Sequence, residues 1–211
     1  MSENQGYYDT DISVELLSSN SPLADYFYLQ DLKQRKLFLD GEINQDTISD
    51  TVHHILQYNR EDADILPEDR QPILLYVNSV GGEVGAGFEL IDVITASKTP
   101  VYTVTFGYLY SMGFLIGLAG HKRFGSMHST YLLHDGSQFL YNSGGKVADT
   151  MEFTRKLESR MKDYILQNTL ISVEDYEAHY RSEWYFFADE AKEKGIIDAI
   201  IDIDCDIDEV I

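Results

Sequence analysis

The sequence has 211 residues, 44% of them hydrophobic and 25% charged, a composition typical of a globular protein that can form a full hydrophobic core as one domain. The formal net charge of −20 argues against nucleic acids and anionic membranes as partners. The only cysteine, Cys205, rules out an internal disulfide and fits a reducing, cytoplasmic location, and no apolar run reaches the roughly 20 residues of a membrane span.

The first 70 residues contain one clear helical pattern between two polar stretches. Residues 1–22 are polar and acidic with little periodicity, which predicts a mobile N-terminal segment. Residues 48–58 place apolar side chains at helical spacing. Residues 59–70 are acidic and contain proline, so they are predicted to form a solvated loop without a chemical role.

Three expected strands each end at a turn. The strands are residues 73–77, 101–105 and 131–133, and the turns that follow them carry Gly81-Gly82, Ser111 and His134. Alternation of such strands with helices is typical of right-handed β-α-β crossovers. Because ligands bind at the carboxyl ends of parallel strands, the glycine, serine and histidine turns are expected to meet at one site.

Ser111 stands before an apolar, helix-like segment, residues 112–119. From this position alone it fits an N-cap, a common role of serine. The same place has unpaired N–H groups and the positive end of a helix dipole, which favour negative charge. A serine hydroxyl is a poor nucleophile until an imidazole takes its proton, so a catalytic Ser111 needs His134 within hydrogen-bond reach.

Four motifs occur in the order and spacing of a known family. They are Asn78-Ser79-Val80-Gly81-Gly82, Ser111-Met112-Gly113, His134 and the closing run from Ala188 to Asp198. From about Tyr28 to Ile200 the chain resembles the proteolytic subunit of the Clp protease (ClpP), within the ClpP/crotonase superfamily. The resemblance implies an α/β fold, a repeated β-β-α superhelix with a protruding strand–helix handle.

The same resemblance implies a division of the chain. Residues 23–202 would form a single domain and residues 203–211 an acidic C-terminal tail, while residues 1–22 would line the entrance pore of a ring. The apolar positions at helical intervals within residues 146–168 fit a surface helix packed on its own domain. The resemblance favours a handle over about residues 137–168, by which two seven-membered rings stack.

The activity implied by the resemblance is serine peptidase chemistry on unfolded polypeptides or peptides inside a homo-oligomeric chamber, without metal or cofactor. Ser111 would be the nucleophile and His134 its base. The backbone N–H groups of Gly82 and Met112 would hold the oxyanion, and a side chain at Gly82 would block the substrate carbonyl. The expected partners are an AAA+ unfoldase or a homologous ClpP subunit.

The third member of the triad departs from the family. The catalytic aspartate there stands five residues before the alanine matched by Ala188, and this position holds Glu183. Glutamate keeps the charge but moves the carboxylate by about a bond length; the alternative is a solvated surface acid. Asp175 and Glu177 are the other candidates, whereas Asp135 is disfavoured because neighbouring strand residues point to opposite faces.

Three further departures concern assembly and substrate access. A family arginine that helps to pair the rings is matched by Ser182, with Arg181 one residue earlier. The small residues usual before the serine are replaced by Tyr108-Leu109-Tyr110, which could narrow the substrate site or pack in a local core. The apolar pockets for the unfoldase are partly kept, with an aromatic residue at one of three matched positions: Tyr76, Leu74 and Ala96.

Three functions therefore compete. The first is the peptidase, and the second is a catalytically impaired subunit that acts as a structural partner of an active homologue. The third is an acyl-CoA enzyme of the crotonase branch, which shares the fold and the oxyanion glycines. The Ser111 and His134 pair argues against the third function, because that branch does not use this dyad.

Overall fold

The computed structural model describes residues 23–136 and 143–211. The predicted mobile segment 1–22 and the first part of the predicted handle, residues 137–142, lie outside the described residues. The chain divides into two compact units, Met1–Lys36 and Leu37–Ile211. The described part of the first unit is helix α2 (Leu23–Lys33) and the turn after it, where Arg35 has a φ of 58°. The predicted boundaries at residues 23, 202 and 203 stay predictions.

The second unit contains a sheet that branches at strand β2 (Ile73–Gly82). In one branch, the first half of β2 pairs with β3 (Val101–Thr105), which pairs with β5 (Lys122–Gly125) and then β8 (Ala199–Ile200). All three pairings are parallel. β2 is also paired with β1 (Lys36–Ile43).

The other branch begins at the second half of β2. Ser79 of β2 pairs with Leu109 of β4 (Tyr108–Tyr110), and β4 pairs with β6 (Thr130–Leu133). These pairings are parallel, whereas β7 (Trp184–Phe187) runs antiparallel to β6 at the edge. From β3 to β6 the chain visits the two branches alternately, so β3, β4 and the next helix form one β-β-α unit and β5, β6 and the next helix form a second. This repetition confirms the predicted fold class.

The helices of the second unit lie between the strands in chain order: α3 (Gln45–Glu61), α4 (Val84–Ala96), α5 (Met112–Leu118), α6 (Gly144–Asn168), α7 (Val173–His179) and α8 (Ala188–Glu193), with 3-10 turns at Pro67–Asp69 and Ile207–Glu209. α3 begins at a reciprocal cap between Asn44 and Thr47. α5 packs against β2, β4 and α4, and all of its residues are buried. This burial explains why its sequence is apolar on every face.

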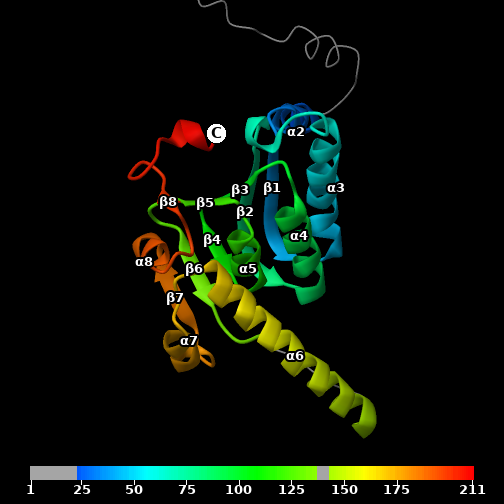
Figure 1. Ribbon diagram of the computed structural model, residues 1–211, viewed down its shortest axis with the longest axis vertical. Coiled ribbons are helices and arrows are strands. Elements are labelled where there is room, and N and C mark those ends of the chain that lie inside the picture. The colour runs from blue at the N-terminus through cyan, green and yellow to red at the C-terminus, as the bar shows by residue number, and fades with distance from the viewer. Residues whose placement is uncertain (1–22, 137–142) are drawn as a thin grey trace, which may run out of the picture. The chain divides into compact units, whose positions relative to one another are not determined.

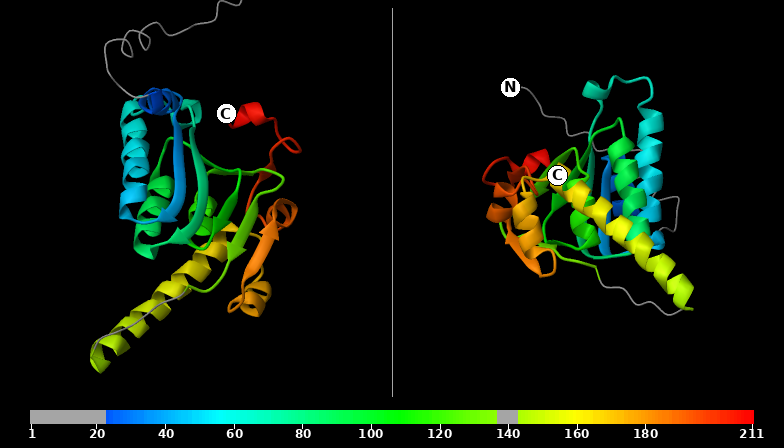
Figure 2. Two further views of the ribbon diagram at one scale, coloured as in Figure 1. Left: turned by 180° about the vertical axis from the view of Figure 1, so that it is seen from behind. Right: turned by 60° about the horizontal axis from the view of Figure 1, so that its bottom comes forward.

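Among the described residues, the buried contacts of helix α6 lie near its C-terminal end. Ile165 is buried, and the Tyr164 hydroxyl donates to the Leu115 carbonyl oxygen at 3.2 Å. The N-terminal part of the helix leads away from the strands (Figures 1 and 2). Met151 and Phe153 are exposed there. These features are those of the helical part of the predicted handle.

The acidic stretch 59–70 is mostly exposed but contains two buried ionic residues. Residues 63–69 are exposed, as predicted, but α3 continues to Glu61, and Asp62 and Arg70 are only 1% and 8% exposed. The Thr99 hydroxyl donates to Asp62 Oδ2 at 2.8 Å, while Arg70 donates to Thr99 Oγ1 at 3.3 Å. The prediction of a loop solvated throughout is therefore wrong for residues 59–61, which lie in α3, and for Asp62 and Arg70, whose buried ionic groups are bonded by Thr99.

The C-terminal stretch is packed on the sheet. Val210 is fully buried in a cluster with Val104, Phe124 and Ile201, and its carbonyl oxygen accepts a hydrogen bond from the Tyr76 hydroxyl. Tyr76 also stacks on the exposed Phe38, with ring centroids 4.7 Å apart. Of the other two positions matched to the unfoldase pockets, Leu74 is buried and Ala96 is exposed. Within residues 23–136 and 143–211, no helix has the length and hydropathy to cross a membrane.

Candidate active site

Ser111 lies at the sharp turn between β4 and α5. Its φ and ψ of 53° and −120° are strained for a residue with a side chain. The turn is held by the neighbouring strand, because the Ser111 N–H donates to the Leu132 carbonyl oxygen of β6 at 3.0 Å. Ser111 occupies the N-cap position of α5, but its hydroxyl makes no capping hydrogen bond. The N-cap reading therefore gives no account of the hydroxyl.

Two glycines at the end of β2 allow close approach of other backbone. A Cβ added at Gly81 (φ +98°) would lie 2.6 Å from Ser111 Cβ and 2.9 Å from Met112 N. A Cβ added at Gly82 (φ +152°) would lie 2.2 Å from the carbonyl oxygen of Ile43. A side chain at Gly81 would thus displace the serine turn. Glycine is needed at position 82 because a side chain there would clash with β1. This reason differs from the predicted one, which was that a side chain would block the substrate carbonyl.

The two predicted oxyanion donors belong to these adjoining segments. Met112 is the first residue of α5, so its N–H is among the amides without an acceptor inside the helix. Gly82 ends β2, one residue after the glycine that touches the serine turn. The structure thus brings the carboxyl end of β2 against the start of α5, next to the Ser111 hydroxyl.

His134 and Glu183 face each other across the antiparallel pair β6–β7. The register pairs Leu133 with Trp184, so the residues just beyond this pair, His134 and Glu183, are opposite each other. His134 Nδ1 lies 3.0 Å from Glu183 Oε1, and the two side chains are 24% and 56% exposed. When Nδ1 carries the proton and donates to the carboxylate, Nε2 is left as the acceptor that a general base requires.

The serine and the histidine are on adjacent segments but are not bonded. Ser111 N–H binds Leu132, two residues before His134. In the part of the chain that the structure describes, no hydrogen bond joins the Ser111 hydroxyl to the His134 ring or to any other group. The structure brings together His134 and Glu183, and it bonds the Ser111 backbone to Leu132, two residues before His134.

The other candidate acids bind elsewhere. Asp175 accepts a hydrogen bond from Lys194 Nζ at 2.7 Å, and this bond holds the pKa of the carboxyl below its usual value. Glu177 pairs with Lys162, and Asp135 is exposed. None of these three described carboxylates contacts the imidazole of His134.

Ser182, which matches the family arginine that helps to pair the rings, and the preceding Arg181 both make local contacts. The Ser182 hydroxyl donates to the His179 carbonyl oxygen at 2.9 Å. The Arg181 guanidinium lies over the ring of Tyr180, 5.7 Å from its centroid. Neither contact tests the predicted role of this position in pairing rings.

The bulky stretch before the serine is divided between two faces of β4. Leu109 is buried in the core, while the rings of Tyr108 and Tyr110 are half-buried and have centroids 5.1 Å apart. The Tyr110 hydroxyl lies 2.9 Å from Thr130 Oγ1. Local packing therefore accounts for Leu109, and the two tyrosines share the other face of the strand with groups of β6.

Sequence reasoning missed Tyr185. Its hydroxyl donates to Glu183 Oε2 at 3.3 Å. The signal that could have found it is strand alternation: on β7, residues two apart share a face, so an extended chain around Glu183 places Tyr185 on the same side.

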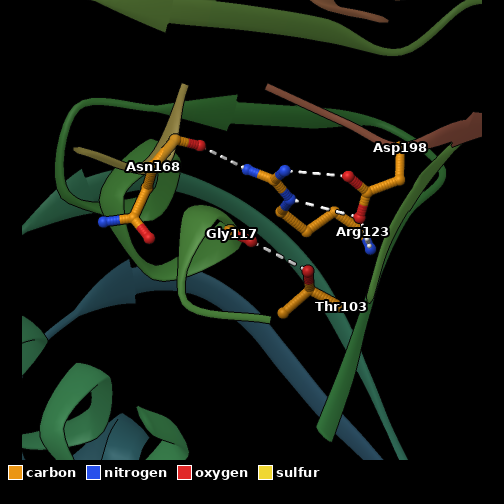
Figure 3. A network of polar contacts seen from close by, with 5 residues as sticks. All are labelled: Thr103, Gly117, Arg123, Asn168 and Asp198. Carbon is orange, nitrogen blue, oxygen red and sulfur yellow. Dashed lines mark hydrogen bonds and ion pairs between the residues drawn. The ribbon is translucent and has the colours of Figure 1, made fainter. Parts of the chain in front are cut away.

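Sequence reasoning also missed a polar network in the other branch of the sheet (Figure 3). Arg123 of β5 donates from Nε and Nη2 to the Asp198 carboxylate at 3.3 and 2.8 Å, and from Nη1 to the Asn168 carbonyl oxygen at 2.7 Å. The backbone N–H of Arg123 also donates to Asp198, at 2.8 Å. Nearby, the Thr103 hydroxyl donates to the Gly117 carbonyl oxygen at 2.8 Å. Asp198 is part of the closing run that suggested the resemblance, and here it connects β5 to β8.

A family model and two curated relatives all match this chain to Clp protease proteins. The family model described as Clp protease matches residues 21–204. The chain is 32% identical over 186 residues to the ATP-dependent Clp protease proteolytic subunit 2 of Treponema pallidum (strain Nichols), covering 86% of this chain and 89% of that protein. It is 29% identical over 177 residues to the ATP-dependent Clp protease proteolytic subunit 1 of Bacillus cereus (strain ATCC 10987 / NRS 248), covering 83% and 89% respectively.

Proposed function

This chain belongs to the Clp protease family, and from that premise we propose that it is a serine peptidase subunit that cleaves unfolded polypeptides or peptides inside an oligomeric chamber. The observation that carries the proposal is the 3.0 Å contact between His134 Nδ1 and Glu183 Oε1. It supplies an oriented imidazole, and the Ser111 hydroxyl on the adjacent segment makes no hydrogen bond within the described residues.

In the proposed reaction the Ser111 oxygen attacks the carbonyl carbon of the scissile peptide bond. His134 Nε2 takes the hydroxyl proton, and the Glu183 carboxylate stabilises the imidazolium that forms. The carbonyl oxygen becomes an oxyanion, which accepts hydrogen bonds from the N–H groups of Gly82 and Met112. Donors of this kind are worth about 3 kcal/mol each in transition-state stabilisation.

Collapse of this intermediate breaks the C–N bond. The proton on His134 passes to the leaving amine, and Ser111 is left as an ester of the acyl fragment. A water molecule then repeats the sequence: His134 takes its proton, the ester carbonyl is attacked, and the proton returns to the serine oxygen. No group beyond these residues and water is needed to balance the atoms.

The proposed assembly is a homo-oligomeric ring that stacks on a second ring and receives substrate from an ATPase. It is supported by the names of the two relatives, which describe ATP-dependent proteolytic subunits. It is also supported by α6, whose projecting part exposes Met151 and Phe153. Large apolar side chains on a projecting element are typical of a surface that a partner covers.

A second function is favoured by one specific observation. The Ser111 hydroxyl is not hydrogen-bonded to His134, so the described state of the chain does not have an activated nucleophile. A subunit locked in this state would act as a structural partner of an active homologue. Catalytic hydrogen bonds commonly shorten only when substrate binds, and this favours the peptidase.

The experiment compares the full chain with Ser111→Ala and Ser126→Ala. Ser126 is a matched control because it also follows a strand end, β5, and its hydroxyl is bonded to Ser129. A serine-directed fluorophosphonate should label wild type and Ser126→Ala but not Ser111→Ala, and hydrolysis of a fluorogenic peptide should follow the same pattern. Equal labelling of all three would refute the assignment of Ser111. Hydrolysis that appears only when an active homologue is added, and is insensitive to Ser111→Ala, would establish the second function.

A further inference from the structure

Three neighbouring strands present a common face on which the His134–Glu183 pair lies. The registers place Tyr110 of β4 beside Leu132 of β6, and Leu132 beside Tyr185 of β7. His134 and Glu183 are each two residues along from Leu132 and Tyr185. Side chains two residues apart in a strand point to the same face, so both members of the pair share their face with Tyr185.

Tyr185 contacts the part of the carboxylate that His134 does not use. Glu183 Oε1 lies 3.0 Å from His134 Nδ1, and Oε2 accepts a hydrogen bond from the Tyr185 hydroxyl at 3.3 Å. Desolvation, and then the charge of Glu183, raise the pKa of the Tyr185 hydroxyl. The phenol therefore stays protonated and acts as the donor in this contact.

The Tyr185 ring is itself held in place. It meets the ring of Tyr110 edge to face, with centroids 6.0 Å apart and planes at 87°, a preferred geometry for aromatic pairs. The Tyr110 hydroxyl in turn lies 2.9 Å from Thr130 Oγ1. A continuous series of contacts thus connects β4, directly before Ser111, with the Glu183 carboxylate directly before β7.

We propose that Tyr185 is a positioning residue that fixes the Glu183 carboxylate against His134. This proposal rests on the proposed peptidase function. Glutamate has one more rotatable bond than aspartate, and the Glu183 side chain is 56% exposed. Such a side chain would occupy several rotamers in solution. A donor on Oε2 selects the rotamer in which Oε1 reaches the imidazole, so it compensates for the extra methylene.

The first measurement compares peptide hydrolysis by the full-length wild type, Tyr185→Phe and Tyr108→Phe. Tyr108→Phe is the matched control, because it removes the same hydroxyl from a ring on the same face that does not bind Glu183 in the described structure. Hydrogen bonds to charged groups are among the stronger ones in proteins, so Tyr185→Phe is expected to lower kcat about tenfold with KM unchanged. Tyr108→Phe is expected to leave both constants within about twofold of wild type.

The same substitution in a Glu183→Asp variant distinguishes positioning of the carboxylate from a general effect on folding. The aspartate side chain is one methylene shorter, so its carboxylate lies farther from the Tyr185 hydroxyl. Adding Tyr185→Phe to Glu183→Asp should therefore change kcat by less than about twofold. An equal loss from Tyr185→Phe in wild type and in the Glu183→Asp background, or no loss in either, would overturn the positioning role. Unchanged thermal unfolding of Tyr185→Phe would exclude instability as the cause of a lower kcat.

A spectroscopic measurement keeps the test independent of peptidase activity. The imidazole N–H proton that binds a carboxylate gives a low-field proton resonance, which we expect in wild type and Tyr108→Phe and which should be lost or broadened in Tyr185→Phe. Absence of Ser111-dependent hydrolysis in wild type would refute the proposed function, and the resonance would still decide the role of Tyr185. A resonance unchanged in Tyr185→Phe would overturn the positioning role even in an active enzyme.

Discussion

Two carboxylates hold matching places in the two branches of the sheet but differ in how fully they are bonded. Glu183 directly precedes β7 and faces His134, just after β6, whereas Asp198 directly precedes β8 and faces Arg123 on β5. Arg123 uses Nε, both terminal nitrogens and its backbone N–H, so the Asp198 pair is almost saturated. In the Glu183 pair both carboxylate oxygens are bonded, but among the described residues the imidazole is bonded through Nδ1 alone.

The difference fits a structural pair at Asp198 and, under the proposed function, a catalytic pair at Glu183. Polar groups with all their hydrogen bonds satisfied hold segments together and have nothing left for a ligand. His134 keeps Nε2, and Ser111 keeps its hydroxyl, so the branch that contains β4, β6 and β7 retains bonding capacity. Variants of Glu183 should therefore lose activity and keep their stability, whereas variants of Asp198 should lose stability and keep their activity.

The largest effect is expected from Glu183→Gln. The amide keeps the shape of the side chain but loses the charge that stabilises the imidazolium, so kcat should fall by a factor on the order of 10⁴, as for the equivalent change in a serine protease. Stability in urea should change little, because the side chain is exposed. Steady-state hydrolysis of a fluorogenic peptide measures the effect, with the exposed Glu68→Gln as the charge-matched control. Turnover equal to that control would mean that another group orients His134.

A smaller effect, on stability alone, is expected from Asp198→Asn. The amide cannot accept all the hydrogen bonds of Arg123, so the free energy of unfolding should fall by about 1–2 kcal/mol. Urea unfolding measures this loss, and kcat per folded molecule should match wild type. The control is Asp64→Asn, an exposed acid in the loop after α3. A large loss of kcat at wild-type stability would contradict the division between the two branches.

The smallest expected effect is on the free energy of unfolding at acidic pH. Asp204, which follows β8, accepts hydrogen bonds from Lys192 and from the Ile200 N–H, and the Lys192 bond is the main reason that its pKa lies below the usual value. A lowered pKa in the folded state means that the contribution is fully present above about pH 4 and is lost as the pH falls further. The unfolding free energy of Asp204→Asn should therefore fall less steeply than that of wild type between about pH 5 and 3. If the unfolding free energies of wild type and Asp204→Asn fall in parallel as the pH is lowered, then Asp204 does not contribute to the acid sensitivity of the fold.

The sequence was most informative where chemistry coincides with a strand end. Ser111 and His134 follow recognisable strands, so their order and their neighbourhood could be predicted from local pattern. The pairing of His134 with Glu183 depends on the register of β6 and β7, which are about 50 residues apart, and only the resemblance suggested it. Arg123 and Asp198 are separated by 75 residues, and no local pattern marks them as partners.

Buried residues inside acidic segments could not be predicted, because composition describes only the average character of a segment. The stretch 59–70 looks solvated as a whole, yet Asp62 and Arg70 within it are buried with Thr99. The stretch 203–211 is acidic, yet Val210 within it is fully buried. In both cases one or two residues make contacts that the surrounding charges conceal.

The backbone of Ser111 has a consequence for how chains of this kind diverge. Glycine adopts its dihedral angles freely, whereas a residue with a side chain is destabilised there by about 1–3 kcal/mol. A related chain that keeps only a structural role in an assembly would gain folding stability if glycine replaced this serine. A glycine at the corresponding position of a related chain would then indicate that the proposed nucleophile was exchanged for a more stable fold.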